Sequence, residues 1–186
     1  MLQNAFANTS SSLMIAKMQG NIVDVLMPPL SEIELALAYA LGGVIRGLVV
    51  GLATELEVWP FAAFGLVDPL LVLYHAVAAT LIMALLGIFA GIWAEKFDHI
   101  AAVTNFVIMP LSFLSGTFYS IERLPEPLQY LAHIDPLFFA IDGFRAGFLG
   151  HADAAPWIGI TVLAAINIAL FTLCLRMFKS GYRLKA

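Results

Sequence analysis

Charged side chains are scarce in this chain of 186 residues: Lys, Arg, Asp and Glu make up 12% of it, against roughly 25% in ordinary globular domains. Hydrophobic residues reach 61%, where about 45–50% is usual. A domain of this size in water cannot bury so much apolar surface, so lipid must solvate a large part of it. The composition therefore predicts an integral membrane protein with the lipid bilayer as a partner.

Further absences exclude other classes of protein. The single cysteine, Cys174, lies in an apolar run and is read as a packing residue, so it defines neither a disulfide framework nor a metal site. The net charge is −4 and no basic patch is interleaved with aromatic residues, which argues against nucleic-acid binding. No G-x-x-x-x-G-K-[ST] motif occurs, so the chain does not bind ATP in the Walker manner. Without a Ser/His/Asp set, paired carboxylates or metal-ligand spacing, we expect neither an enzyme nor a metal site.

Long apolar runs fill most of the chain and predict four membrane-spanning helices. Ser31 and Glu34 form a capping-box pattern at the start of the first one. A helix needs about 20 apolar residues to cross the hydrocarbon. The runs that meet this expectation are 31–54, 70–93, a third that starts near Ala101, and 157–178.

A segment of mixed polarity, 13–30, precedes the first predicted span. Its apolar residues recur at helical spacing, Gly20 weakens its middle, and Pro28 and Pro29 end it. The small polar run 8–12 in front of it suits a helix end or cap. We predict one amphipathic helix that lies on the membrane surface.

The first span carries a packing motif and a charge. Three glycines repeat every four residues and predict a smooth face where another helix approaches closely: Gly43, Gly47 and Gly51. Arg46 lies in the outer half of the same run, and a charge in the hydrocarbon costs at least about 2.5–3.5 kcal/mol on insertion scales. One interpretation is structural, by snorkelling or by pairing with Asp142 or Asp68, and the other is contact with an anionic substrate group. We favour the structural one.

The most informative stretch is 105–145. Pro110, Ser115 and Gly116 interrupt an apolar run. A second apolar run, 137–149, covers only about 20 Å as a helix, too short for a core of about 30 Å. A re-entrant or interfacial hairpin fits this stretch better than a simple loop. We expect Asp142 and Arg145, at i and i+3, to form an ion pair.

The order MPLSFLSGTFYSIERLP, followed by IDPLFFAIDGFR, resembles the external signature of type-2 ABC transporter permeases, the membrane subunits of ATP-driven exporters, and the segment 10–46 adds to it. The resemblance implies an all-α integral membrane protein with four transmembrane helices, a cytoplasmic coupling segment over 13–30 and an external re-entrant hairpin over 119–150. It makes 1–186 one partial transmembrane domain, in which the first two helices of the family are missing.

The resemblance also implies partners and roles. The chain would bind no cofactor itself, because a separate ATPase subunit would use the ATP, and a second permease copy would complete the assembly. The residues implied in docking that ATPase are Lys17, Gly20, Asp24, Val25, Leu26 and Pro29. Arg46, Asp142 and Arg145 would be pathway or structural charges. The transported substrate would be a lipid, glycolipid, polysaccharide or drug-like molecule.

Basic residues near the C-terminus set the expected orientation. By the positive-inside rule, four side chains place that end in the cytoplasm of an inner-membrane protein: Arg176, Lys179, Arg183 and Lys185. Four spans then place the N-terminal segment in the cytoplasm too. The alternative to an exporter permease is a four-span structural or assembly protein, or a permease fragment without transport. Binding of an ATPase subunit through 13–30 distinguishes the two.

Overall fold

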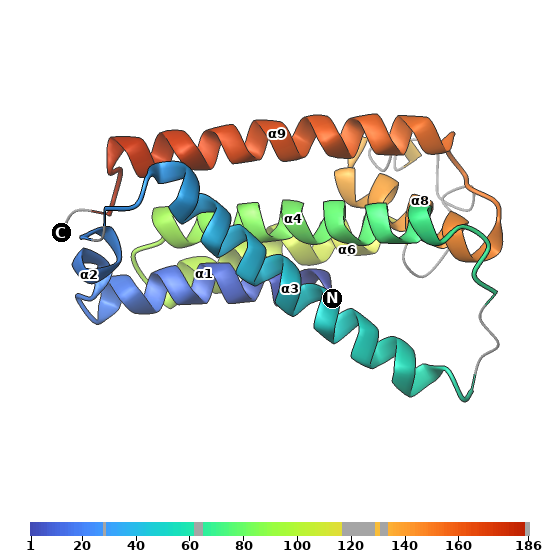
Figure 1. Ribbon diagram of the computed structural model, residues 1–186, viewed down its shortest axis with the longest axis horizontal. Coiled ribbons are helices and arrows are strands. Elements are labelled where there is room, and N and C mark those ends of the chain that lie inside the picture. Colours follow the sequence, from blue (N-terminus) through green and yellow to red (C-terminus); the bar gives the residue numbers. More distant parts are fainter. Residues whose placement is uncertain (28, 62–64, 117–128, 131–133, 185–186) are drawn as a thin grey trace.

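The computed structural model describes residues 1–27, 29–61, 65–116, 129–130 and 134–184, and every regular element in these ranges is a helix (Figure 1). Four helices are long and apolar enough to cross a membrane: α3 (Glu32–Val58), α4 (Pro69–Trp93), the continuous helix Phe97–Leu114 and α9 (Pro156–Ser180). The predicted fold class, an all-α protein with four membrane spans, is confirmed.

Helix α4 is the centre of the bundle. It packs against α1 (Leu2–Met18), α3, α8 (Pro136–Leu149) and α9, and 72% of its most apolar window is buried, against 28% for α3. Asp68 caps its start, where one carboxylate oxygen accepts the backbone N–H groups of Leu70 and Leu71 at 3.0 Å each. The predicted capping box of Ser31 and Glu34 at the start of α3 is confirmed as well.

The N-terminal segment departs from the prediction. Instead of one surface-lying helix within 13–30, the chain forms α1, a turn, and the short α2 (Ile22–Leu26). The prediction is wrong because Gly20 adopts a φ of +74°, the left-handed conformation that ends helices and that glycine adopts without strain. Helix α1 lies inside the bundle, where Leu13 and Met14 are fully buried.

The third span is one helix with three labels: α5 (Phe97–Val103), the π-helical turn η1 (Thr104–Ile108) and α6 (Met109–Leu114). Pro110 does not break the span, which continues to Leu114, but the π-helical turn interrupts the regular α-helix just before it. The predicted interruption at Ser115 and Gly116 is confirmed. The wider π turn lies directly before this proline, whose ring crowds the preceding turn of an ordinary α-helix. The helix ends at Leu114, and Gly116, two residues later, has a φ of +77°.

Helix α8 is the second arm of the predicted external hairpin, and its 14 residues form one uninterrupted helix. Residues 117–128 and 131–133, where the first arm of that hairpin was predicted, lie outside the described ranges. The carbonyl of Gly147 accepts the N–H groups of Val67 and Asp68, both at 2.9 Å, so the end of α8 is tied to the start of α4. Asn167 on α9 donates to Ala78 O of α4 at 3.1 Å, as expected of an interhelical hydrogen bond.

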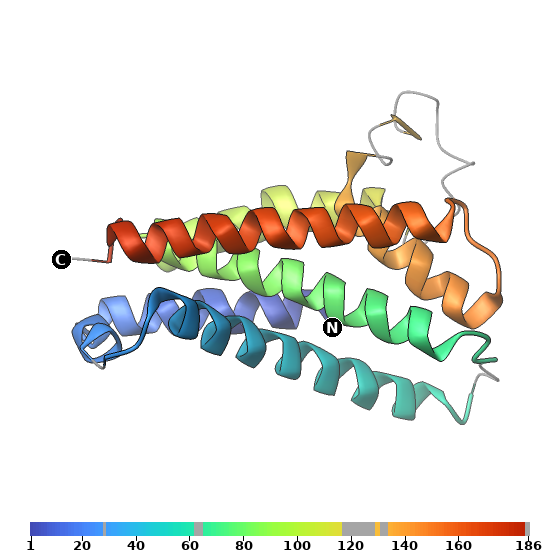
Figure 2. The ribbon, with the colours of Figure 1, turned by 45° about the horizontal axis from the view of Figure 1, so that its top comes forward.

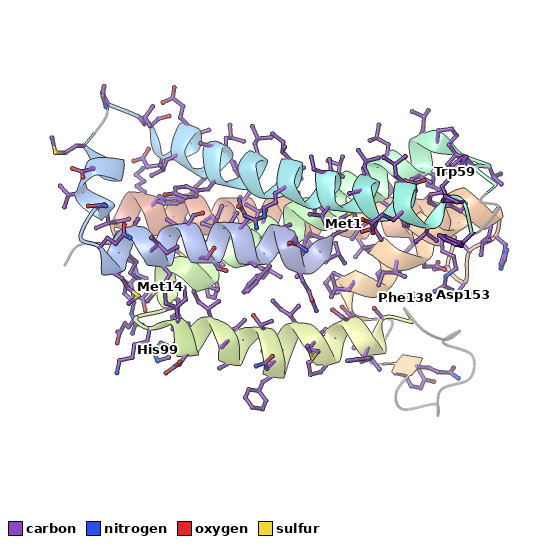
Figure 3. All side chains as sticks on the ribbon, turned by 90° about the horizontal axis from the view of Figure 1, so that it is seen from below. Met1, Met14, Trp59, His99, Phe138 and Asp153 are labelled. Carbon is purple, nitrogen blue, oxygen red and sulfur yellow. The ribbon has the colours of Figure 1, made fainter. Side chains whose placement is uncertain are left out.

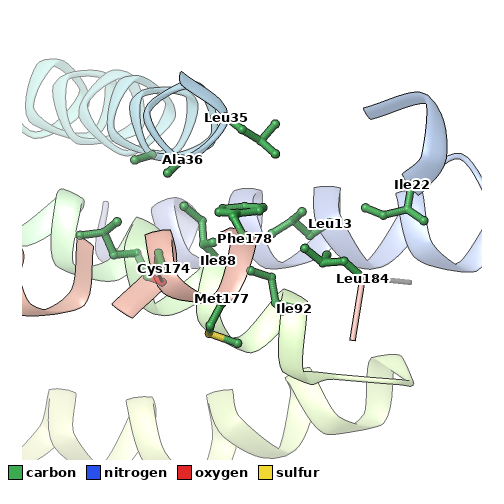
Figure 4. Packing of buried hydrophobic residues seen from close by; sticks show 12 residues of the cluster. Leu13, Ile22, Leu35, Ala36, Ile88, Ile92, Cys174, Met177, Phe178 and Leu184 are labelled. Carbon is green, nitrogen blue, oxygen red and sulfur yellow. Dashed lines mark hydrogen bonds between the residues drawn. The ribbon is translucent and has the colours of Figure 1, made fainter. Parts of the chain in front are cut away.

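The connections gather at two opposite ends of the bundle (Figures 1 and 2). One end carries α2, the link between α4 and α5, and the C-terminal turn. The close-up in Figure 4 shows Ile22 of α2 and Leu184 of that turn beside Leu13 of α1, and all three belong to one buried cluster. The other end carries the α3–α4 link and the α8–α9 turn.

Candidate functional site

Helix α1 has two faces of different chemistry. Its buried face combines small and apolar side chains against α3 and α4: Ala5, Phe6, Thr9, Ser10, Leu13 and Met14. The rest of its surface carries amides and hydroxyls that are exposed or half-buried: Gln3, Asn4, Asn8, Ser11 and Ser12. Asn4, Asn8 and Ser11 share one side of the helix, because residues spaced by three and four lie above one another.

The polar face of α1, defined by those five residues, runs beside the spans and not along a membrane surface. A Cβ on Gly43 would lie 2.8 Å from Thr9 Cγ2, and one on Gly51 would lie 2.9 Å from Met1 Sδ. Gly51 is about 28 Å along α3 from Glu32. The start of α1 therefore lies next to the interior of a membrane-spanning helix, and its polar groups lie at the depth of the hydrocarbon.

Two elements flank this polar face. In Figure 3, α1 lies between α3 on one side and the α5–α6 helix on the other. A groove of about 250 Å³ separates α1 from α5 and η1. Its lining mixes apolar and hydroxyl side chains: Gln3, Phe6, Ala7, Ser10, Ser11, Phe97, Ile100, Thr104 and Ile108.

Arg46 lies on the α3 side of the polar face. It is exposed, and its Nη1 donates to Asn8 Oδ1 at 3.1 Å. The structural pairing predicted with Asp142 or Asp68 is wrong, because both carboxylates accept backbone N–H groups elsewhere. Asp68 caps α4, and Asp142 binds the turn before α9. Arg46 thus has a neutral partner among the described residues, not a carboxylate.

The predicted ion pair between Asp142 and Arg145 is also wrong. The two Asp142 oxygens accept the N–H groups of Asp153 and Ala154, each at 2.9 Å. Arg145 Nη2 donates to Gly116 O at 2.7 Å, and its Nη1 lies 3.6 Å from Asp153 Oδ2. A helix pair at i and i+3 is worth only about 0.2–0.5 kcal/mol, so better-placed partners in the α8–α9 turn prevail. Both charges hold the end of the bundle together.

Lys17 and Arg183 close the opposite end of α4. Lys17 Nζ donates hydrogen bonds to carbonyls in the last turn of α4 and just after it: Gly91, Ile92 and Ala94. Arg183 Nη1 donates to Trp93 O at 2.7 Å and pairs with Glu95 at 3.4 Å. Burial, followed by the charge of Arg183, lowers the pKa of Lys17, while Glu95 opposes this. These cations satisfy carbonyls that a helix end leaves unpaired.

The other residues assigned to docking lie around α2. Gly20, Asp24 and Pro29 are exposed, and so are the neighbouring apolar side chains of Val23 and Met27. The backbone of Val25 and Leu26 belongs to α2, but their side chains lie outside the described part of the chain. An exposed apolar patch at this end is typical of an interaction surface.

The three repeated glycines of α3 lie where helices come closest. A Cβ on Gly43 would lie 2.7 Å from Ala84 Cβ, and one on Gly47 would lie 2.8 Å from Thr80 Cγ2, both on α4. Gly51 faces Met1 at the start of α1. Close approach of this kind replaces the hydrophobic driving force that helices lack in lipid.

Sequence reasoning missed the polar face of α1, because the run 8–12 was interpreted as a helix end. A signal was present: Asn4, Asn8 and Ser11 recur at helical spacing, opposite to Ala5, Thr9 and Leu13. Among the described residues no group of three potential metal ligands comes together. The arrangement is thus suited to guiding a polar or amphiphilic molecule past the spans, and we find no set of side chains for covalent chemistry in the described ranges.

Residues 1–149 match the family model described as ABC-2 type transporter. The chain belongs to this family. Over all 186 residues it is 36% identical to the inner membrane transport permease YadH of Escherichia coli K12, and the match covers 72% of that protein. Nodulation protein J of Neorhizobium galegae is 30% identical over 108 residues, 58% of this chain and 39% of that protein.

A more distant relative is the capsule polysaccharide export inner-membrane protein CtrC of Neisseria meningitidis, 28% identical over 95 residues, 46% of this chain and 35% of that protein. No solved structure matches the chain. Together with the four spans, these relatives make the chain a multi-pass inner membrane protein. It is the membrane subunit of an ABC exporter, a permease and not itself an enzyme.

Proposed function

We propose that the polar face of α1 lines the route by which this permease carries its substrate across the membrane. The observation that carries the proposal is a set of five exposed or half-buried polar side chains on α1, at hydrocarbon depth. Helix α1 itself lies between α3 and the α5–α6 helix (Figure 3). Polar groups inside a membrane normally face water or protein, because lipid cannot hydrogen-bond them. A second copy of the chain, facing this side, would close the route.

The end that carries α2 is the one we assign to the cytoplasm. Its cations, Lys17 and Arg183, agree with the positive-inside rule, and Arg176 and Lys179 lie on the last turns of α9 at the same end. The opposite end carries Asp68, Asp153 and the α8 hairpin arm, so it would face outwards. Helix α2 and the C-terminal turn would then be cytoplasmic, whereas Met1 lies beside Gly51 within the bundle (Figure 1).

ATP hydrolysis by a separate ATPase subunit would reach the pathway through α2. This short helix is joined to α1 by the turn at Gly20. Lys17, at the end of α1, donates hydrogen bonds to backbone carbonyls at the end of α4. A push on α2 would therefore move α1 as a lever against α4 and change the width of the groove next to α5. The route would open towards one side of the membrane at a time.

The mixed lining of the groove supports a proposal for the substrate class. Phe6, Ile100 and Ile108 offer apolar contact, and Ser11 and Thr104 offer hydroxyl groups. This combination suits a lipid, a glycolipid or a drug-like amphiphile. The relatives include a capsule polysaccharide export protein, so a lipid-linked polysaccharide belongs to the same range.

Isolation of the assembly from native membranes tests the proposal. The chain is tagged at its C-terminus, extracted gently, and every bound subunit is identified by mass spectrometry. We expect a Walker-motif ATPase, and we expect the double variant Val25→Glu, Leu26→Glu to lose it. Ala155→Glu is the control, because it adds negative charge at an exposed position on the opposite end of the bundle. An assembly without any ATPase would refute the exporter role and favour a structural four-span protein.

A further inference from the structure

Arg46 forms no ion pair with a carboxylate among the described residues. It lies near the middle of the 27-residue helix α3, it is exposed, and its hydrogen bond goes to the neutral amide oxygen of Asn8. An intramembrane arginine normally pairs with a carboxylate or faces water. Because no such pair links Arg46 to a described carboxylate, an anion that pairs with it would come from outside the described part of this chain.

Several acidic residues of the bundle either lie too far from Arg46 to form an ion pair or already accept hydrogen bonds from backbone N–H groups. Along α3 the closest carboxylates are Glu55 and Glu34, about 13 Å and about 18 Å from Arg46 by helical rise. Glu34 is also held in the capping box of Ser31. Asp68 and Asp142 bind backbone N–H groups at the other end of the bundle, and Asp135 caps α8.

We propose that Arg46 and Asn8 bind the anionic headgroup of an amphiphilic substrate, and this inference rests on the pathway proposed above. A guanidinium carries five N–H donors in a planar fork that matches carboxylate and phosphate oxygens. One donor is used by Asn8, which leaves the others for a ligand. The amide nitrogen of Asn8 adds two more donors next to them.

The apolar part of the same ligand has a place on the other side of α1. The groove lined by Phe6, Ile100 and Ile108 flanks the helix opposite to the Arg46 side. A helix with its side chains is about 10–12 Å wide. An amphiphile whose headgroup contacts Arg46 would lie across Asn4 and Ser11 and reach the groove with its apolar chain. The polar surface between the two subsites allows the headgroup to cross.

Binding to the tagged assembly, reconstituted in neutral phosphatidylcholine nanodiscs with whatever subunits it retains, tests this inference. The probes are dodecyl phosphate, dodecyl phosphocholine and inorganic phosphate. The first is an anion with an alkyl chain, the second has the same chain but no net charge, and the third is an anion without a chain. We expect dodecyl phosphate to bind at least tenfold more tightly than either of the other two. Equal affinity for dodecyl phosphocholine would overturn the charge preference, and equal affinity for inorganic phosphate would overturn the amphiphile.

Asn8→Asp is the decisive variant, because it changes shape very little and places a carboxylate beside Arg46. An internal ion pair would neutralise the arginine, so we expect at least a tenfold loss of dodecyl phosphate binding together with an unchanged or higher melting temperature. Arg46→Gln should lose binding too, whereas Arg46→Lys should keep it within about fivefold. Undiminished binding by Asn8→Asp would overturn the inference, and this readout does not depend on whether Arg46→Gln folds.

The outcome is separable from that of the proposed function. If the assembly contains an ATPase but dodecyl phosphate binding does not change in the Arg46 variants, only the anion subsite is overturned. An assembly without an ATPase but with Arg46-dependent binding would overturn the exporter role and keep the subsite.

Discussion

The two faces of α1, a helix of 17 residues, differ in their packing and in their polar contacts. One face meets α3 and α4 so closely that glycine is required opposite to it, and its polar atoms are satisfied within the bundle: Thr9, for example, donates to Ala84 O of α4 at 2.9 Å. The other face keeps Gln3 and Ser12 exposed and offers Asn8 to Arg46. The first face explains why the bundle holds together, and the second carries the pathway proposed above.

The largest effect should come from the packed face. A Cβ on Gly87 would lie 2.0 Å from Thr9 Oγ1 and 2.5 Å from the backbone oxygen of Phe6. Backbone atoms cannot give way unless α1 and α4 separate, so we expect Gly87→Ala to cost more than about 3 kcal/mol. Size-exclusion chromatography of the tagged protein should show loss of the monodisperse peak.

Gly42→Ala is the matched control for that change. Its Cβ would meet only Asn8 Nδ2, at 3.8 Å. Alanine is favoured over glycine inside a helix by about 0.8–1 kcal/mol, so this variant should be as stable as the parent or more so. Equal behaviour of the two variants would contradict the close contact between α1 and α4.

A second pair of variants compares Asp142, a charge that stabilises the fold, with Arg46, for which we expect no structural role. Asp142→Ala leaves the N–H groups of Asp153 and Ala154 without their acceptor, at a cost of about 1–3 kcal/mol for each group that stays buried. We expect the melting temperature of the purified protein to fall by roughly 4–10 °C. Arg46→Gln should change it by less than about 2 °C, because an exposed hydrogen bond contributes little. A larger loss for Arg46→Gln would assign it a structural role.

Lys17 should have a smaller effect than Asp142. Its three hydrogen bonds to the end of α4 are half-exposed, so Lys17→Ala should cost about 1–2 kcal/mol, or roughly 2–6 °C in melting temperature. Lys179→Ala, an exposed cation at the same end, is the control and should be neutral. Because the same hydrogen bonds would transmit motion from α2, Lys17→Ala should also weaken coupling of ATP hydrolysis to transport.

The features that depend on residues close together in the chain could be predicted from the sequence. The four apolar runs, the Ser31 capping box and the fold class were predicted from composition and spacing alone. The family was suggested by the residues around the third span and the hairpin.

The predictions that failed depend on residues far apart in the chain. Burial of Thr9 and Ser10 requires Gly87 and Gly91, more than seventy residues away, so the N-terminal polar run had the pattern of a helix end. Asp142 and Arg145 have ion-pair spacing, but the α8–α9 turn brings closer partners. The docking residues and the role of Arg46 stay predictions, since they concern molecules outside this chain.

The most direct test of the account is to ask whether water reaches the polar face of α1. In a Cys174→Ala background, Ser11→Cys, Ile45→Cys and Leu13→Cys are treated in membranes with a maleimide that cannot cross lipid. Ile45 is 61% exposed on α3, and Leu13 is fully buried. We expect Ser11→Cys to react, and the other two to react only after denaturation. Protection of Ser11→Cys equal to that of Ile45→Cys would mean that lipid or protein covers this face, and would contradict the pathway.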